Sequence, residues 1–167
     1  MNDTRLTING LVENPLALSA ADLAAIDSQH QIADVGVVVP GRRGRGVMLR
    51  AVLALASPQA AAGYITLHSA ADDFHASVPL AAVRDSGVLV YQLDGQPLPE
   101  SAGGPIRFLL PDTAACHTAE VDECANVKFV DRLELSAGKG HDNRPSTLRE
   151  HERLHEAERQ RQAEQSQ

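Results

Sequence analysis

Short apolar runs, many of them alternating or β-branched, divide the first 135 residues into predicted strands. Alternation of apolar and polar residues predicts a strand over 6–12, and β-branched residues predict another over 32–39, ended by Pro40-Gly41. Further strands are expected at 64–68, 88–93, 105–110 and 126–135. The pair Asp94-Gly95 supplies the positive φ angles of a tight turn, so 88–98 is predicted to form a β-hairpin.

Three short helices are expected between these strands. Ser19 is a favoured N-cap for a helix over 20–26, and Asp22 lies in its first turn, where a carboxylate interacts favourably with the helix dipole. Apolar residues at helical spacing predict a second helix over 47–56, and a third begins near Pro79. Because strands outnumber helices, the pattern predicts an α+β domain with a mixed β-sheet and short helices.

The composition changes sharply after residue 137. Residues 1–137 form the predicted domain, and residues 138–167 form a polar linker followed by a charged helical tail. Thr147 and Glu150 resemble a capping box at the start of the tail helix. This helix has little apolar surface to bury, so we expect it to fray unless a protein partner contacts it.

Charge and composition disfavour several classes of partner. The 167-residue chain is long enough to bury a core, but its net charge of −7 and its 3% aromatic content argue against nucleic acid. No apolar run approaches the roughly 20 residues that span a membrane, and the N-terminus lacks a secretory pattern. With two cysteines only, the sequence predicts a reduced, cytoplasmic protein.

A basic loop stands out on this acidic chain. Arg42, Arg43 and Arg45 lie in Gly41-Arg-Arg-Gly-Arg-Gly46, where glycines let the backbone approach an anion and arginines can form two hydrogen bonds to phosphate. The alternative is a solvated loop without a ligand. These three arginines are therefore a candidate site for phosphate or another anionic small molecule.

No metal site and no catalytic residue are assigned from the residues alone. Cys116, His117 and Cys124 lie close together in the sequence, but structural zinc needs four ligands and their spacing fits no standard arrangement. Two buried thiols and a Cys116–Cys124 disulfide remain open alternatives. His151 and His155, four residues apart on the predicted tail helix, are expected on a solvated face.

Several segments, taken in order over residues 6–135, resemble one known family. The chain opens with Leu6-Thr-Ile-Asn-Gly-Leu-Val-Glu-Asn-Pro-Leu16, and Gly46-Val-Met-Leu49 begins the second predicted helix. The most specific block is Val88-Leu-Val-Tyr-Gln-Leu-Asp-Gly-Gln-Pro-Leu-Pro99, followed by Gly103-Gly-Pro-Ile-Arg-Phe-Leu-Leu-Pro111. Together with Asn126-Val-Lys-Phe-Val-Asp-Arg-Leu-Glu-Leu135, these segments resemble the molybdopterin-binding domain of sulfite-oxidase-type oxidoreductases.

The resemblance implies a fold, a cofactor and one further site residue. Molybdopterin is the implied cofactor, Lys128 matches the family lysine that meets the pterin phosphate, and the basic loop is expected near the mouth of the pterin site. The family's molybdenum-ligand cysteine would lie upstream of the Gly-Val helix, yet Val35-Gly-Val-Val-Val-Pro-Gly41 stands there and no cysteine precedes Cys116. The His before the Gly-Gly-Pro run is also replaced, by Glu100-Ser-Ala102.

These departures leave three functional hypotheses. The first is a molybdopterin-binding, oxidoreductase-like protein that lacks the usual cysteine ligand. The second is a non-catalytic binding or interaction module that retains the fold. In the third, Cys116 or Cys124 supplies the molybdenum thiolate from a new position in the chain.

Overall fold

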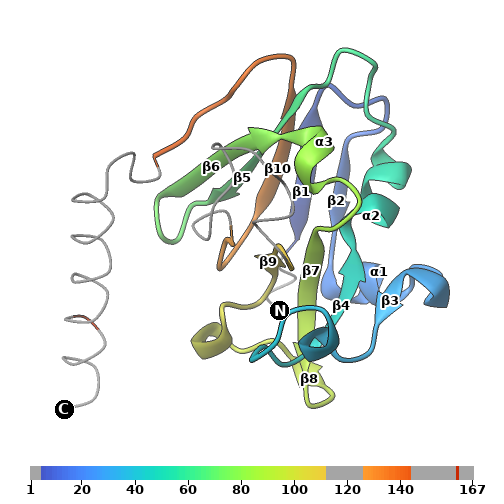
Figure 1. Cartoon of the computed structure of the whole chain (residues 1–167), viewed down its shortest axis with the longest axis vertical. Helices are drawn as coiled ribbons and strands as arrows, with labels where there is room; N and C mark the ends of the chain where they lie inside the picture. Colours follow the sequence, from blue (N-terminus) through green and yellow to red (C-terminus); the bar gives the residue numbers. More distant parts are fainter. Residues whose placement is uncertain (1–4, 112–125, 144–160, 162–167) are drawn as a thin grey trace.

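Two β-sheets form the body of the protein (Figure 1). The computed structural model describes residues 5–111, 126–143 and 161. The first sheet has the strand order β2 (Leu16–Leu18), β1 (Leu6–Gly10), β10 (Arg132–Ser136), β5 (Tyr64–Ser69) and β6 (Phe74–Pro79). The second has the order β3 (Gln31–Ile32), β4 (Arg45–Met48), β7 (Val88–Leu93) and β8 (Gln96–Pro97), and β9 (Arg107–Leu109) also pairs with β7.

Short helices complete the α+β class that the sequence predicted. The α-helices are α1 (Ala20–Ala24), α2 (Leu49–Ala56) and α3 (Leu80–Val83), and 3-10 helices span Ser28–His30, Val35–Val37 and Glu100–Ala102. Strands β1 and β10 run parallel, whereas the other strand pairs of the described residues are antiparallel. The first sheet is therefore mixed, as expected, but a second sheet stands beside it.

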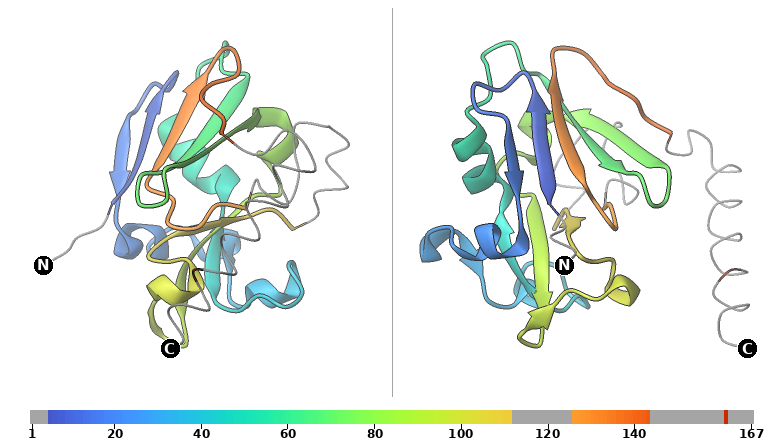
Figure 2. Two further views of the ribbon diagram at one scale, coloured as in Figure 1. Left: turned by 90° about the vertical axis from the view of Figure 1, so that its left-hand side faces the viewer. Right: turned by 180° about the vertical axis from the view of Figure 1, so that it is seen from behind.

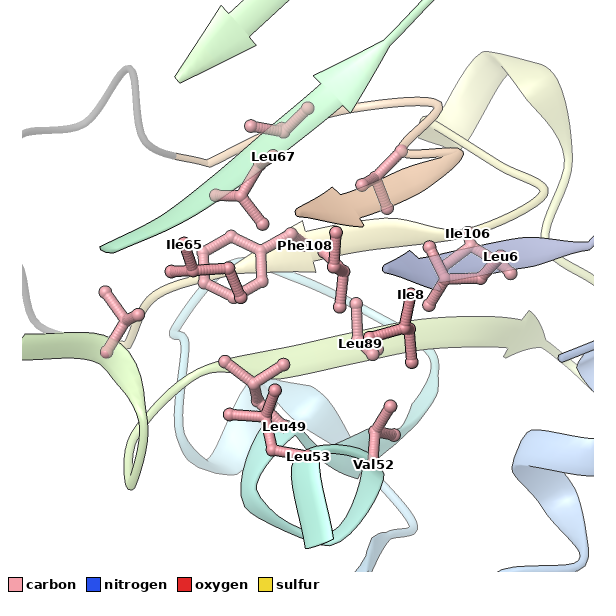
Figure 3. Close-up of a cluster of buried hydrophobic side chains, with 14 of the residues drawn as sticks. Leu6, Ile8, Leu49, Val52, Leu53, Ile65, Leu67, Leu89, Ile106 and Phe108 are labelled. Atoms are coloured by element: carbon pink, nitrogen blue, oxygen red, sulfur yellow. The ribbon is translucent and has the colours of Figure 1, made fainter. Parts of the chain in front are cut away.

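One cluster of buried side chains joins the two sheets. Leu6 and Ile8 of β1 and Ile65 and Leu67 of β5 are fully buried, and they pack in the same cluster as Leu89 of β7. Phe108 of β9 and the apolar face of α2 complete this cluster (Figure 3). The two further views show the first sheet above the second, with α2 beside both (Figure 2). Burial of this apolar surface is the main force that holds the sheets together.

Two local predictions are confirmed by backbone geometry. The Ser19 side chain accepts a hydrogen bond from the Asp22 amide, and the Asp22 carboxylate accepts one from the Ser19 amide, which completes a capping box at α1. In the hairpin formed by β7 and β8, Asp94 has φ 52° and Gly95 has φ 77°, as a tight hairpin turn requires.

The strand predicted over 32–39 is wrong beyond Ile32. The Asp34 carboxylate accepts a hydrogen bond of 2.9 Å from the Gly36 amide and caps the 3-10 helix that follows. This side-chain contact offers the backbone an alternative to strand pairing. The helix predicted over 47–56 also begins later, at Leu49, because Val47 and Met48 pair with β7.

Residues 138–143, which we name the strap, follow β10 and lie along β6. They were expected to belong to a polar linker, but hydrogen bonds join Gly140, Asp142 and Asn143 to β6. The predicted tail helix, with His151 and His155, lies outside the described residues, as do Cys116, His117 and Cys124. Within the described part of the chain, no helix has the length and apolar character needed to cross a membrane.

Candidate anion-binding site

The basic loop forms one wall of a groove of about 550 Å³. Arg42, Arg43 and Arg45 all line this groove, and so do residues Gln92–Gly95 of the β7–β8 hairpin. The remaining lining residues are Ala33, Asp34, Gly36 and Gly44. Gly44 allows the basic loop to lie close to β7, because a Cβ at this position would be only 2.6 Å from the carbonyl oxygen of Gln92. The structure thus brings the three predicted arginines to one surface feature.

Arg43 is partly neutralised by Asp94. Its Nη2 lies 2.9 Å and 3.1 Å from the two carboxylate oxygens of Asp94, which also lines the groove. Both side chains are exposed, by 71% and 69%, so water and salt screen this ion pair. An anion that binds Arg43 therefore competes with Asp94. Sequence reasoning missed this pairing because the two residues are 51 positions apart.

Arg45 is oriented by neutral groups. Its Nε donates a hydrogen bond of 3.2 Å to the hydroxyl of Tyr91, which is only 2% exposed. That hydroxyl donates to Oε1 of Gln31, whose Nε2 in turn donates to the carbonyl oxygens of Leu23 (2.9 Å) and Ile26 (3.1 Å). No carboxylate takes part in this chain of hydrogen bonds, so these partners orient Arg45 without neutralising its positive charge.

Arg107, on β9, is a site residue that the sequence analysis did not single out. Its Nη1 donates to the carbonyl oxygen of Ala102 at 3.1 Å, but its Nε is buried and has no hydrogen-bond partner among the described residues. Burial, and after it the positive charge of Arg42, lowers the pKa of Arg107 to about 10. The sequence offered one indication of its role, because Arg107 belongs to the Gly103-Gly-Pro-Ile-Arg107 block that carries the family resemblance.

Lys128 approaches Arg107 at Gly103. A Cβ at Gly103 would lie 2.9 Å from Cδ of Arg107 and 3.1 Å from Cγ of Lys128, and its φ of +94° also favours glycine. Lys128 is exposed and is not one of the residues that line the groove. The four residues predicted to bind an anion therefore lie in two neighbouring regions. The three arginines of the basic loop line the groove, whereas Lys128 lies beside Arg107. The charge of Arg42 links the two regions, because it also lowers the pKa of Arg107.

The described residues do not provide a metal centre. They contain no cysteine, and no three His, Cys, Asp or Glu side chains among them are grouped so that they could hold a metal ion. The arrangement can hold anionic groups by charge-assisted hydrogen bonds.

The two-sheet α+β fold is similar to that of a sulfite-oxidase-type domain. The chain has the fold of the sulfane dehydrogenase SoxCD from Paracoccus pantotrophus, with a TM-score of 0.61 and 24% sequence identity, over 82% of this chain and 39% of that chain. It belongs to the oxidoreductase molybdopterin binding domain family, whose model matches residues 1–143. The family match confirms the resemblance, and it includes the strap.

One curated relative also matches part of the chain. The uncharacterized oxidoreductase YuiH of Bacillus subtilis (strain 168) is 28% identical over 116 residues, which is 66% of this chain and 58% of that protein. The chain therefore spans little more than half the length of this relative.

Proposed function

We propose that this domain binds the phosphate of a molybdopterin-type cofactor, with Arg107 and Lys128 as the phosphate ligands. Arg42, Arg43 and Arg45 form the adjoining cationic wall. The observation that carries the proposal is the buried, unpartnered Nε of Arg107 beside the like charge of Arg42. A phosphate oxygen would accept from this N–H, and its negative charge would offset the repulsion between the two arginines.

The described residues fit the phosphate of the cofactor but not its metal. The resemblance implies a cysteine thiolate as the molybdenum ligand, and the first cysteine of the chain is Cys116, outside the described residues. We therefore assign no reaction step to the described part of the chain. On this proposal the protein is a binding member of an oxidoreductase family, and its role rests on holding an anionic pterin.

Phosphate binding is tested by thermal unfolding of the full chain at low ionic strength. With inorganic phosphate at about ten times its Kd, we expect the Tm of the parent protein to rise by roughly 3–5 °C. Arg107→Gln and Lys128→Gln should each abolish most of this rise. Arg50→Gln is the matched control, because it removes one positive charge from an exposed arginine of α2 that is not part of the proposed site. Equal rises in all four proteins would contradict the proposal.

Catalytic competence is tested by elemental analysis. The molybdenum chemistry that the family resemblance implies needs a cysteine thiolate, and Cys116 and Cys124 are the two cysteines of this sequence. We expect protein purified from a host that makes the cofactor to lack stoichiometric molybdenum. Stoichiometric molybdenum that disappears in Cys116→Ser or Cys124→Ser would contradict this expectation and establish a relocated ligand.

A further inference from the structure

Three histidines lie in a row where the strap crosses β6. Nδ1 of His68 on β5 lies 2.7 Å from Nδ1 of His75 on β6. The ring of His75 then meets the ring of His141 on the strap, with 4.5 Å between ring centroids. These residues are outside the set that lines the groove, so the proposed anion site does not account for them.

Carboxylates occupy both ends of the His68–His75 pair. Nε2 of His68 lies 2.9 Å from Oε1 of Glu134, and Nε2 of His75 lies 3.1 Å from Oδ1 of Asp73. Nη2 of Arg132 also lies 3.2 Å from Nε2 of His68. Nε2 of His68 therefore has two alternative partners, one that accepts a hydrogen bond and one that donates.

The number of protons on the pair decides which contacts survive. When both rings are neutral, His68 donates from Nδ1 to His75, His75 donates from Nε2 to Asp73, and Nε2 of His68 accepts from Arg132. One added proton lets Nε2 of His68 donate to Glu134 instead, and the Nδ1–Nδ1 hydrogen bond remains. A second added proton places N–H groups on both Nδ1 atoms, and two donors on two like-charged rings cannot stay 2.7 Å apart.

Burial opposes the second proton. The pKa of His68 is lowered, chiefly because the ring is buried; the hydrogen bond to Glu134 raises it in part, and the charge of Arg132 lowers it again. Burial of the ring therefore disfavours an extra proton on His68. The charged and titratable side chains around the pair come from β10, the β5–β6 turn and the strap: Asp131, Arg132, Glu134, Asp73, His141 and Asp142.

The strap is attached to the same residues. The amide of His75 donates to Oδ1 of Asn143 (2.9 Å), and the amide of Asn143 donates to the carbonyl oxygen of His75 (3.0 Å). Nδ2 of Asn143 donates to the carbonyl oxygen of Asp73 at 2.6 Å. Displacement of His75 therefore disturbs two hydrogen bonds and one ring contact of the strap, and the third hydrogen bond of Asn143 is made to nearby Asp73.

A second group of strap contacts lies two residues further along β6, at Ser77. The amide of Gly140 donates to Oγ of Ser77 (2.8 Å), and the amide of Ser77 donates to Oδ2 of Asp142 (3.0 Å). Gly140 lies so close to β5 that a Cβ would be 2.5 Å from Oγ1 of Thr66. These amides report whether the strap is attached.

We propose that the His68–His75 pair is an acid-sensitive clasp, which holds the strap on β6 while it binds no more than one extra proton and releases the strap when it binds two. Release frees the segment that leads to residues 144–167 from the domain. The device is independent of the proposed phosphate site.

The test follows amide hydrogen exchange in the full chain by NMR. Between about pH 7 and about pH 5, we expect the protection factors of Gly140 and Asn143 to fall about tenfold or more, while Leu11, which donates to Leu135 between β1 and β10, keeps its protection. His68→Gln retains hydrogen bonding without a second titrating ring and should hold the strap through this range. His30→Gln, a change in a distant 3-10 helix, should behave like the parent.

Two results would overturn the clasp. One is constant strap protection in the parent between these pH values; the other is an equal loss in the parent and in His68→Gln, which would assign release to Asp142 or His141. Should His68→Gln fail to fold, the imidazole nitrogen signals of the parent decide. Two separate titration steps, with strap loss at the more acidic one, support the clasp, and one shared step contradicts it.

Discussion

The buried hydroxyl of Tyr91 connects the basic loop to the segment after α1. It accepts a hydrogen bond from Nε of Arg45 and donates one to Gln31, which itself binds the carbonyl oxygens of Leu23 and Ile26. One wall of the groove is thus oriented by a side chain that does not itself line the groove.

Replacement of Tyr91 by Phe should affect both stability and anion binding. The change leaves Oε1 of Gln31 without its donor and Nε of Arg45 without its acceptor, so we expect a loss of about 1–3 kcal/mol in the free energy of unfolding, measured with urea. The phosphate-induced rise in Tm should also fall. On an Arg45→Met background the same substitution should no longer change the phosphate response; an undiminished effect there would refute the positioning role.

Replacement of Asp94 by Asn should strengthen phosphate binding. Asn tolerates the φ of 52° at this turn, so the hairpin is retained, while Arg43 loses its competing carboxylate. We expect phosphate affinity to rise roughly two- to fivefold at low salt, with less than about 1 kcal/mol change in stability. Asp85→Asn, at an exposed position away from the groove, controls for the change in net charge. Equal affinities in the two variants would show that the charge of Arg43 does not contribute to phosphate binding.

Truncation should locate the end of the folded domain. A chain that ends at Ala137 loses the hydrogen bonds of Gly140, Asp142 and Asn143 to β6, and we expect its Tm to fall by about 4–8 °C. A chain that ends at Asn143 retains these bonds and should keep the parent Tm. Identical melting of the two truncated chains would mean that the strap adds no stability.

The capping box of α1 predicts a specific acid response. Hydrogen bonds from the backbone and then the side chain of Ser19 lower the pKa of Asp22, so this carboxylate stabilises the folded state above its ordinary pKa. That contribution is lost as the pH falls through the lowered pKa of the folded state. Asp22→Ala should therefore melt below the parent at neutral pH, and the gap should close under acid conditions. A gap in Tm that stays constant with pH would disprove the assignment.

The sequence predicted best those features whose partners are neighbours in the chain. Ser19 and Asp22 are three residues apart, and Asp94-Gly95 is a dipeptide, so both could be interpreted without knowledge of the fold. The error after Ile32 has the opposite cause. The run of β-branched residues there favours a strand, but the Asp34 carboxylate bonds the Gly36 amide and turns the chain before pairing can continue.

The site was predicted in composition but not in its contacts. The arginines of the basic loop could be identified from sequence, whereas the partners Asp94 and Tyr91 come from a strand and a turn about 50 residues later. Arg107 was missed because its surroundings, not its sequence pattern, make it unusual: a strand arginine is ordinarily expected at the surface, and here its Nε is buried.

The parallel pairing of β1 with β10 sets the order in which the protein can be assembled during synthesis. Thr7 lies opposite Arg132, about 125 positions later in the chain, and β10 also separates β1 from β5. A ribosome must therefore release almost the whole domain before the centre of the first sheet can close. Until then β1 and β5 each present an unpaired edge. Unpaired strand edges favour aggregation, so the nascent chain is exposed to this risk until β10 has been synthesised.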